Sequence, residues 1–127
     1  MAYKNYLKIL LKIIALVTII SGLIQMLAPN FILGMIGGEI TGSTLHFFGI
    51  IGMFMIFFGG LLLHALSGNR NIPVAVLWCG LQKFGAAVAV GLAVGRGLFS
   101  WLALGVAAFD LISGILIFIH WYAIKNR

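Results

Sequence analysis

Residues 73–122 read PVAVLWCGLQKFGAAVAVGLAVGRGLFSWLALGVAAFDLISGILIFIHWY. Two apolar runs flank a short connection, and each run has one charged residue near its middle, Lys83 in the first and Asp110 in the second. If the runs form an antiparallel helical hairpin, a rise of about 1.5 Å per residue places both charges at nearly the same depth. Either charge alone at the bilayer centre would cost roughly 2.5–3.5 kcal/mol. The stretch therefore predicts a membrane hairpin with a buried Lys83–Asp110 ion pair.

The rest of the chain has the same character, since 63% of its 127 residues are hydrophobic and only 8% are charged. A soluble domain of this size could not bury so much apolar surface. Crossing a hydrocarbon core takes about 20 helical residues, and the runs lack the alternation of barrel strands. We therefore predict an all-α integral membrane protein, a single compact bundle of four transmembrane helices within residues 1–127. The predicted spans are Leu7 to Leu27, Thr44 to Leu66, Pro73 to Val94 and Phe99 to Tyr122.

The distribution of basic residues predicts the orientation of these spans. Arg96 is the only basic residue expected on one side of the membrane. Lys and Arg near span ends stay on the cytoplasmic face, so both termini are predicted to be cytoplasmic. The net charge of +6 then reflects topology and contact with lipid headgroups, and no nucleic-acid partner is expected. The basic residues assigned to the cytoplasmic side are Lys4, Lys8, Lys12, Arg70, Lys125 and Arg127.

The connection from Ala28 to Ser43 is the only long one, and its first half is apolar. It is predicted to lie in the outer interface or to form a short re-entrant turn. Glu39, the one carboxylate in this connection, could be a ligand or a proton-uptake group, but a lone carboxylate in a loop is usually just solvated.

Small residues surround both midspan charges at helical spacing, so the Lys83 face and the Asp110 face are expected to meet. A structural pair that fixes the helix register is the favoured reading. The alternative is a proton or ion relay in which Asp110 titrates, with a polar lining from Thr18, Ser21, Gln25, Gln82 and Ser113. The small or apolar residues on the two faces are Val76, Cys79, Gly80, Ala86, Ala87 and Val90 in the third span, and Ala103, Val106, Ala107, Ser113 and Gly114 in the fourth.

Three histidines are candidate ligand-binding residues. His46 and His64 share one face of the second span but lie at its opposite ends, whereas His64 and His120 are expected at a similar depth. Two histidines on facing helices could hold a haem iron, but interfacial histidines more often bond to backbone, headgroups or water. We predict no metal site and no cofactor, with haem as a minor alternative.

The sequence lacks the common catalytic motifs. Cys79 is the only cysteine, so no intramolecular disulfide, Cys-x-x-Cys redox pair or thiolate zinc cluster can form. The sequence contains no Gly-x-Ser-x-Gly turn, no His-Glu-x-x-His helix and no phosphate-binding glycine loop. The protein is therefore predicted not to be an enzyme.

Three stretches carry a family resemblance: HFFGIIGMFMIFFGG (46–60), WCGLQKFGA (78–86) and AFDLI (108–112). Together they resemble small bacterial four-helix inner-membrane proteins, DoxX-like in size and layout. That group often has Arg, Gly-Lys and Gly-Asp-Leu where this chain has His46, Gln82-Lys83 and Phe109-Asp110-Leu111. The resemblance implies a bacterial cytoplasmic membrane and the four-helix layout, but no common activity.

Three classes of function fit these features. The favoured one is a non-catalytic accessory or assembly subunit of a membrane complex. The second is a small oligomeric transporter of protons, ions or solutes that uses the Lys83–Asp110 pair. The third is a binder of a lipophilic cofactor such as haem or quinone. Expected partners are membrane lipids together with either further copies of the chain or other membrane subunits.

Overall fold

The computed structural model describes residues 2–127, and all regular secondary structure in that range is helical. Four helices, α1, α3, α4 and α5, are long and apolar enough to cross a membrane, which confirms the predicted number of spans. The short helix α2 lies between the first two. The helices are α1 (Ala2–Leu27), α2 (Pro29–Met35), α3 (Gly42–Ser67), α4 (Pro73–Gly95) and α5 (Ala103–Ile124).

The helices differ from the predicted spans at three places. Helix α1 begins at Ala2, five residues before the predicted start at Leu7. The predicted loop from residue 28 to 43 contains α2, which begins at Pro29. Proline is well suited to the first turn of a helix, because the backbone N–H that it lacks would have no partner within the helix there. The last span was expected to begin at Phe99, but α5 begins at Ala103. The chain turns first at Gly97, whose φ of +74° suits glycine.

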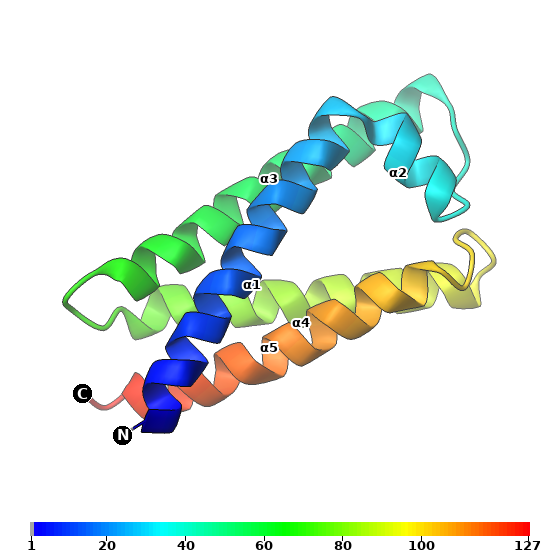
Figure 1. Cartoon of the computed structure of the whole chain (residues 1–127). Coiled ribbons are helices and arrows are strands. Elements are labelled where there is room, and N and C mark those ends of the chain that lie inside the picture. The colour runs from blue at the N-terminus through cyan, green and yellow to red at the C-terminus, as the bar shows by residue number, and fades with distance from the viewer. Residues whose placement is uncertain (1) are drawn as a thin grey trace.

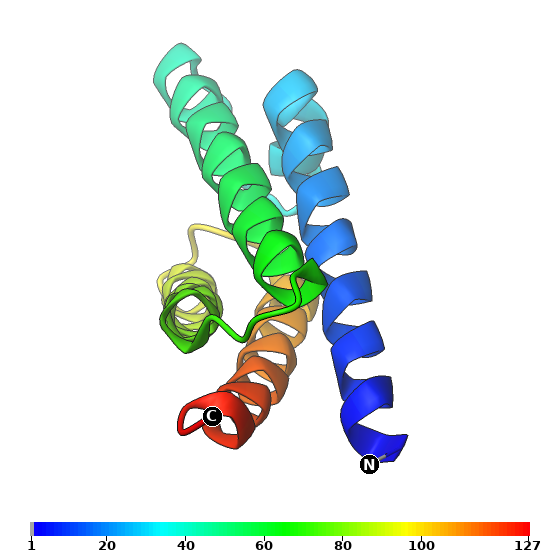
Figure 2. The ribbon, with the colours of Figure 1, turned by 90° about the vertical axis from the view of Figure 1, so that its left-hand side faces the viewer.

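The four long helices form two antiparallel pairs. α1 packs mainly along α3 and α4 mainly along α5, while contacts between the pairs are fewer (Figures 1 and 2). Both termini lie at one end of the molecule, which we call the terminal end, and α2 lies at the opposite, α2 end (Figure 1). The pairs meet near the terminal end and diverge toward the α2 end, so the fold is a V of two hairpins and not an evenly packed bundle.

The α1–α3 pair is held at backbone contact by glycines. A Cβ atom built on Gly22 would lie 2.5 Å from the carbonyl oxygen of Gly52, and one built on Gly52 would lie 2.6 Å from that of Gly22. Farther along, a Cβ on Gly59 would lie 3.0 Å from the carbonyl oxygen of Ala15. Small residues permit such close approach in membranes, where dispersion between well-fitted surfaces replaces the hydrophobic effect.

A buried apolar cluster joins the two hairpins near the terminal end, and every long helix contributes to it. Since all four helices share this cluster, it forms the apex of the V. Its buried members are Leu11, Ile14, Ala15, Leu62, Ala65, Leu66, Val76, Cys79, Ile117 and Ile124.

Helix α2 joins the hairpins at the opposite end. Leu33 and Ile36 pack with Ala103 of α5 in a second buried cluster, and the backbone N–H of Ser100 donates to the carbonyl of Ile36 at 2.7 Å. The following residue, Gly37, has a φ of +77°, and a Cβ there would lie 3.0 Å from that of Ser100. The predicted interfacial segment is thus a short helix that connects the open ends of the V.

Candidate functional site

Lys83 lies midway along α4 and forms the ion pair that the sequence predicts. Its ammonium nitrogen is 3.2 Å from Oδ1 of Asp110 on α5, and only 6% of the Lys83 side chain and 12% of the Asp110 side chain are exposed. This is the only salt bridge among residues 2–127. The pair therefore belongs to one hairpin, α4–α5, and neutralises both midspan charges there.

A third residue extends this pair to the other hairpin. The Lys83 ammonium also donates to Oγ1 of Thr18 on α1 at 2.7 Å, and the Thr18 hydroxyl donates to the carbonyl of Ile14 at 2.9 Å. The Phe109 ring lies with its centroid 5.1 Å from the same ammonium, at cation–π distance. We call Thr18, Lys83 and Asp110 the clasp, because their bonds join the interiors of α1, α4 and α5.

Small residues next to the clasp let α4 and α5 approach closely. A Cβ on Gly80 would lie 3.2 Å from Ile117, and one on Gly114 would lie 3.2 Å from the ring of Phe84. The residues of the expected faces are buried or half-buried except Val106, which is 47% exposed. Ala103, on the same face of α5 and nearer the α2 end, is fully buried against α2.

The other polar residues considered from the sequence lie apart from one another. Gln25 is buried, but its Nε2 donates to the carbonyl of Phe48 at 2.9 Å and so links α1 to α3. Ser113 is buried on α5, Gln82 is half-buried and Ser21 is exposed on the outside of α1. Of these five predicted lining residues, only Thr18 bonds to the ion pair.

The histidines have different surroundings. His46 and His64 are exposed on α3, whereas His120 is 9% exposed on α5. His46 borders a pocket of about 430 Å³ near the α2 end, together with Met26 and Met53. No cluster of three or more His, Cys, Asp or Glu side chains able to hold a metal ion occurs within residues 2–127. A haem between His64 and His120 remains a prediction from the sequence.

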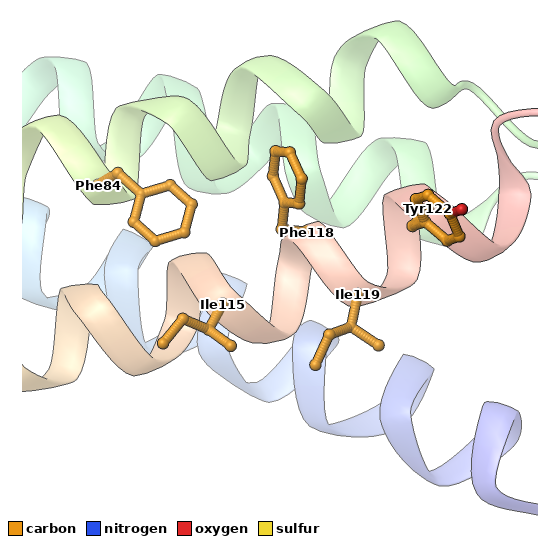
Figure 3. Close-up of a pocket in the computed structure, with 5 residues that line it drawn as sticks. All are labelled: Phe84, Ile115, Phe118, Ile119 and Tyr122. Carbon is orange, nitrogen blue, oxygen red and sulfur yellow. The ribbon is translucent and has the colours of Figure 1, made fainter.

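A second surface feature was not recognised from the sequence. An open groove of about 440 Å³ runs along the outside of the α4–α5 hairpin (Figure 3). Four of its lining residues are spaced along one face of α5, and that spacing is visible in the sequence. The same spacing occurs in ordinary membrane-facing residues. Only the structure shows that the ring of Phe84 on α4 completes a groove with them. The lining residues are Phe84, Ile115, Phe118, Ile119 and Tyr122.

Comparison with known proteins adds no relative. The sequence matches no protein-family model, and neither the curated proteins nor the solved structures gave a match. The resemblance to DoxX-like proteins thus rests on the three short stretches alone. The structure itself has four helices that are long and apolar enough to span a membrane.

Proposed function

We propose that the protein is a non-catalytic subunit of a membrane complex, in which the clasp holds two hairpins at a fixed angle for a membrane partner. The observation that carries this proposal is the bonding of Lys83, whose buried ammonium is engaged by Asp110 of its own hairpin and by Thr18 of the other. A group bonded on both sides stabilises one arrangement of the helices.

The bonding of the neighbouring polar groups favours this structural role over a relay. A proton or ion path requires polar groups that continue from the charged pair toward a surface. The Thr18 hydroxyl instead donates to a backbone carbonyl within α1, and the Gln25 amide donates to a backbone carbonyl of α3. Both donors are therefore used on backbone carbonyls, and neither continues from the clasp toward a surface.

The outer faces of α4 and α5 offer room for a partner helix. A Cβ built on Gly85 or on Gly105 would meet no atom within 4 Å. Glycines on a membrane-facing surface allow a second helix to approach closely. The partner in this proposal is either another copy of the chain or a different membrane subunit.

Mild extraction from the native membrane followed by native mass spectrometry tests the assembly role. We expect a complex of fixed stoichiometry that is lost in Gly85→Leu and kept in Gly60→Leu. Gly60 is the matched control, because a Cβ there also meets nothing within 4 Å but lies on α3. A monomer in mild detergent, or equal behaviour of the two variants, would contradict assembly through α4.

Transport is the second candidate, and one observation favours it. The Asp110 side chain is 12% exposed, and Lys83 bonds to only one of its two carboxylate oxygens. The protein in proteoliposomes would then pass protons or another ion, and Asp110→Asn would abolish the flux. A flux no greater than that of empty vesicles would count against transport.

The cellular setting belongs to the same proposal. The resemblance to DoxX-like proteins supports a bacterial cytoplasmic membrane. Both termini lie at one end of the molecule (Figure 1), and Lys4, Lys8, Lys125 and Arg127 are near those termini. A cytoplasmic terminal end follows from the positive-inside rule.

A further inference from the structure

The groove on the α4–α5 hairpin is lined along α5 by apolar side chains. Ile115, Ile119 and Tyr122 follow one another along α5 (Figure 3), and the seven residue-to-residue steps from Ile115 to Tyr122 span about 10 Å of helix axis. The groove therefore runs along the axis of α5, from the middle of that helix toward its terminal end. Its lining is apolar except for the phenol of Tyr122 at that end.

Aromatic rings form one wall of the groove and continue past it. The Phe84 and Phe118 ring centroids are 6.2 Å apart, and those of Phe118 and Trp121 are 4.9 Å apart. Gly114 sets the position of Phe84, since a Cβ there would lie 3.2 Å from the ring. Packed rings lose little side-chain freedom when a ligand binds, so this wall is already in place for one.

A cation lies at the terminal end of the groove. The Lys125 ammonium is 4.1 Å from the centroid of Tyr122 and 5.2 Å from that of Trp121. These two rings hold the ammonium beside the groove, and no carboxylate pairs with it, because the one salt bridge in residues 2–127 is Lys83–Asp110. An ammonium so placed can donate to a phosphate.

Charge at this end of the molecule favours an anionic occupant. The sequence has only two acidic residues, Glu39 and Asp110. Glu39 is in the connection that follows α2, at the opposite end, and Asp110 is neutralised inside the clasp. Lys125 and Arg127 therefore have no acidic side chain near them at the terminal end, and anionic lipid headgroups complement such a surface.

We propose that this groove is a binding site for one anionic phospholipid, with an acyl chain along Phe84, Ile115, Phe118 and Ile119 and the phosphate at Lys125. The site does not rest on the assembly role, because neither Gly85 nor Gly105 lines the groove. It differs from general attraction to the membrane surface in joining a shaped apolar groove to one positioned cation.

Fluorescence quenching by brominated lipids tests this site in the full chain. Replacing Trp78 and Trp101 by Phe leaves Trp121, beside the groove, as the single emitter. The protein is reconstituted in mixtures of phosphatidylcholine and phosphatidylglycerol that have identical acyl chains, with bromine on one lipid at a time. We expect Trp121 to select brominated phosphatidylglycerol about fivefold, as one cation near an anionic headgroup predicts.

Lys125→Gln and Arg70→Gln are the matched variants, since each removes one cation from a segment at the terminal end. The preference should disappear in Lys125→Gln and persist in Arg70→Gln, with both variants equally helical and monodisperse. Equal selection in the two variants, or no selection in the parent, would overturn the proposal. Weak quenching by both lipids in a dimeric protein would also overturn it and assign the groove to a second copy of the chain.

Discussion

At the scale of single residues, the clasp explains how a lysine and an aspartate remain inside a chain with so few polar groups. Each charge removes the insertion penalty of the other, and Thr18 supplies a second acceptor for the ammonium. Buried charges are stable only when their bonding capacity is met, so the clasp should respond strongly to the loss of any one member.

Replacing one member of the ion pair should destabilise the protein more than replacing both. Lys83→Met and Asp110→Leu each leave one uncompensated charge at midspan, and we expect each to lower the free energy of unfolding by about 3 kcal/mol. The double variant should recover most of that loss, because it leaves no charge. Unfolding in a mixed detergent series measures all four proteins. Single variants as stable as the parent would contradict a stabilising pair.

Thr18→Val tests the bond between the hairpins separately. Valine has nearly the shape of threonine but cannot accept from the Lys83 ammonium, so a loss of about 1–3 kcal/mol is expected. Ser21→Ala is the control on the same helix, because Ser21 is exposed and its replacement should change stability by less than about 0.5 kcal/mol. Equal stability of the two variants would show that Thr18 contributes nothing to the clasp.

At the scale of helices, small residues decide which faces pack. The sequence predicts the Lys83 and Asp110 faces because each is centred on a charge that needs a partner, and the structure brings these faces together. The sequence does not distinguish Gly52 and Gly59, which pack on α1, from Gly60, which has open space around it. All three are glycines in one apolar helix, and only the partner's position tells them apart.

The α1–α3 contact can be tested with the smallest substitution. Gly22→Ala places a methyl group 2.5 Å from the carbonyl oxygen of Gly52, and the helices must separate, at an expected cost of about 1–3 kcal/mol. Gly60→Ala meets no neighbour within 4 Å and should be neutral or slightly stabilising, since alanine favours helix by up to about 1 kcal/mol. Thermal unfolding in one detergent compares them. A stabilised Gly22→Ala would contradict the close packing.

At the scale of the whole molecule, the spans could be predicted from the sequence, but the V could not. Length and hydropathy determine how many helices cross a membrane, and adjacent helices with short connections pack antiparallel. The angle between two hairpins depends on contacts far apart in the chain, such as that between Ile36 and Ser100. Helix α2 was missed for a related reason, because a seven-residue helix is stabilised mainly by the cluster it packs on.

Membrane topology gives a test of the whole arrangement. In a Cys79→Ala background, we expect a cysteine at Ser43 to react with a membrane-impermeant maleimide in intact cells. A cysteine at Asn126 should react only after the cells are permeabilised, because the positive-inside rule predicts that the basic terminal end faces the cytoplasm. The opposite labelling pattern would invert the proposed orientation, and labelling of both sites in intact cells would contradict a single orientation.

The order of the clasp residues along the chain has a consequence for biosynthesis. Lys83 precedes Asp110 by 27 residues, so at about 5–20 residues per second the ribosome makes Asp110 roughly 1–5 s after Lys83. During that interval the ammonium has no carboxylate to pair with. Thr18, which precedes Lys83 by 65 residues, has already been synthesised. The nascent α4 can therefore pack against the first hairpin, where the Lys83 ammonium donates a hydrogen bond to Thr18 until Asp110 has been synthesised.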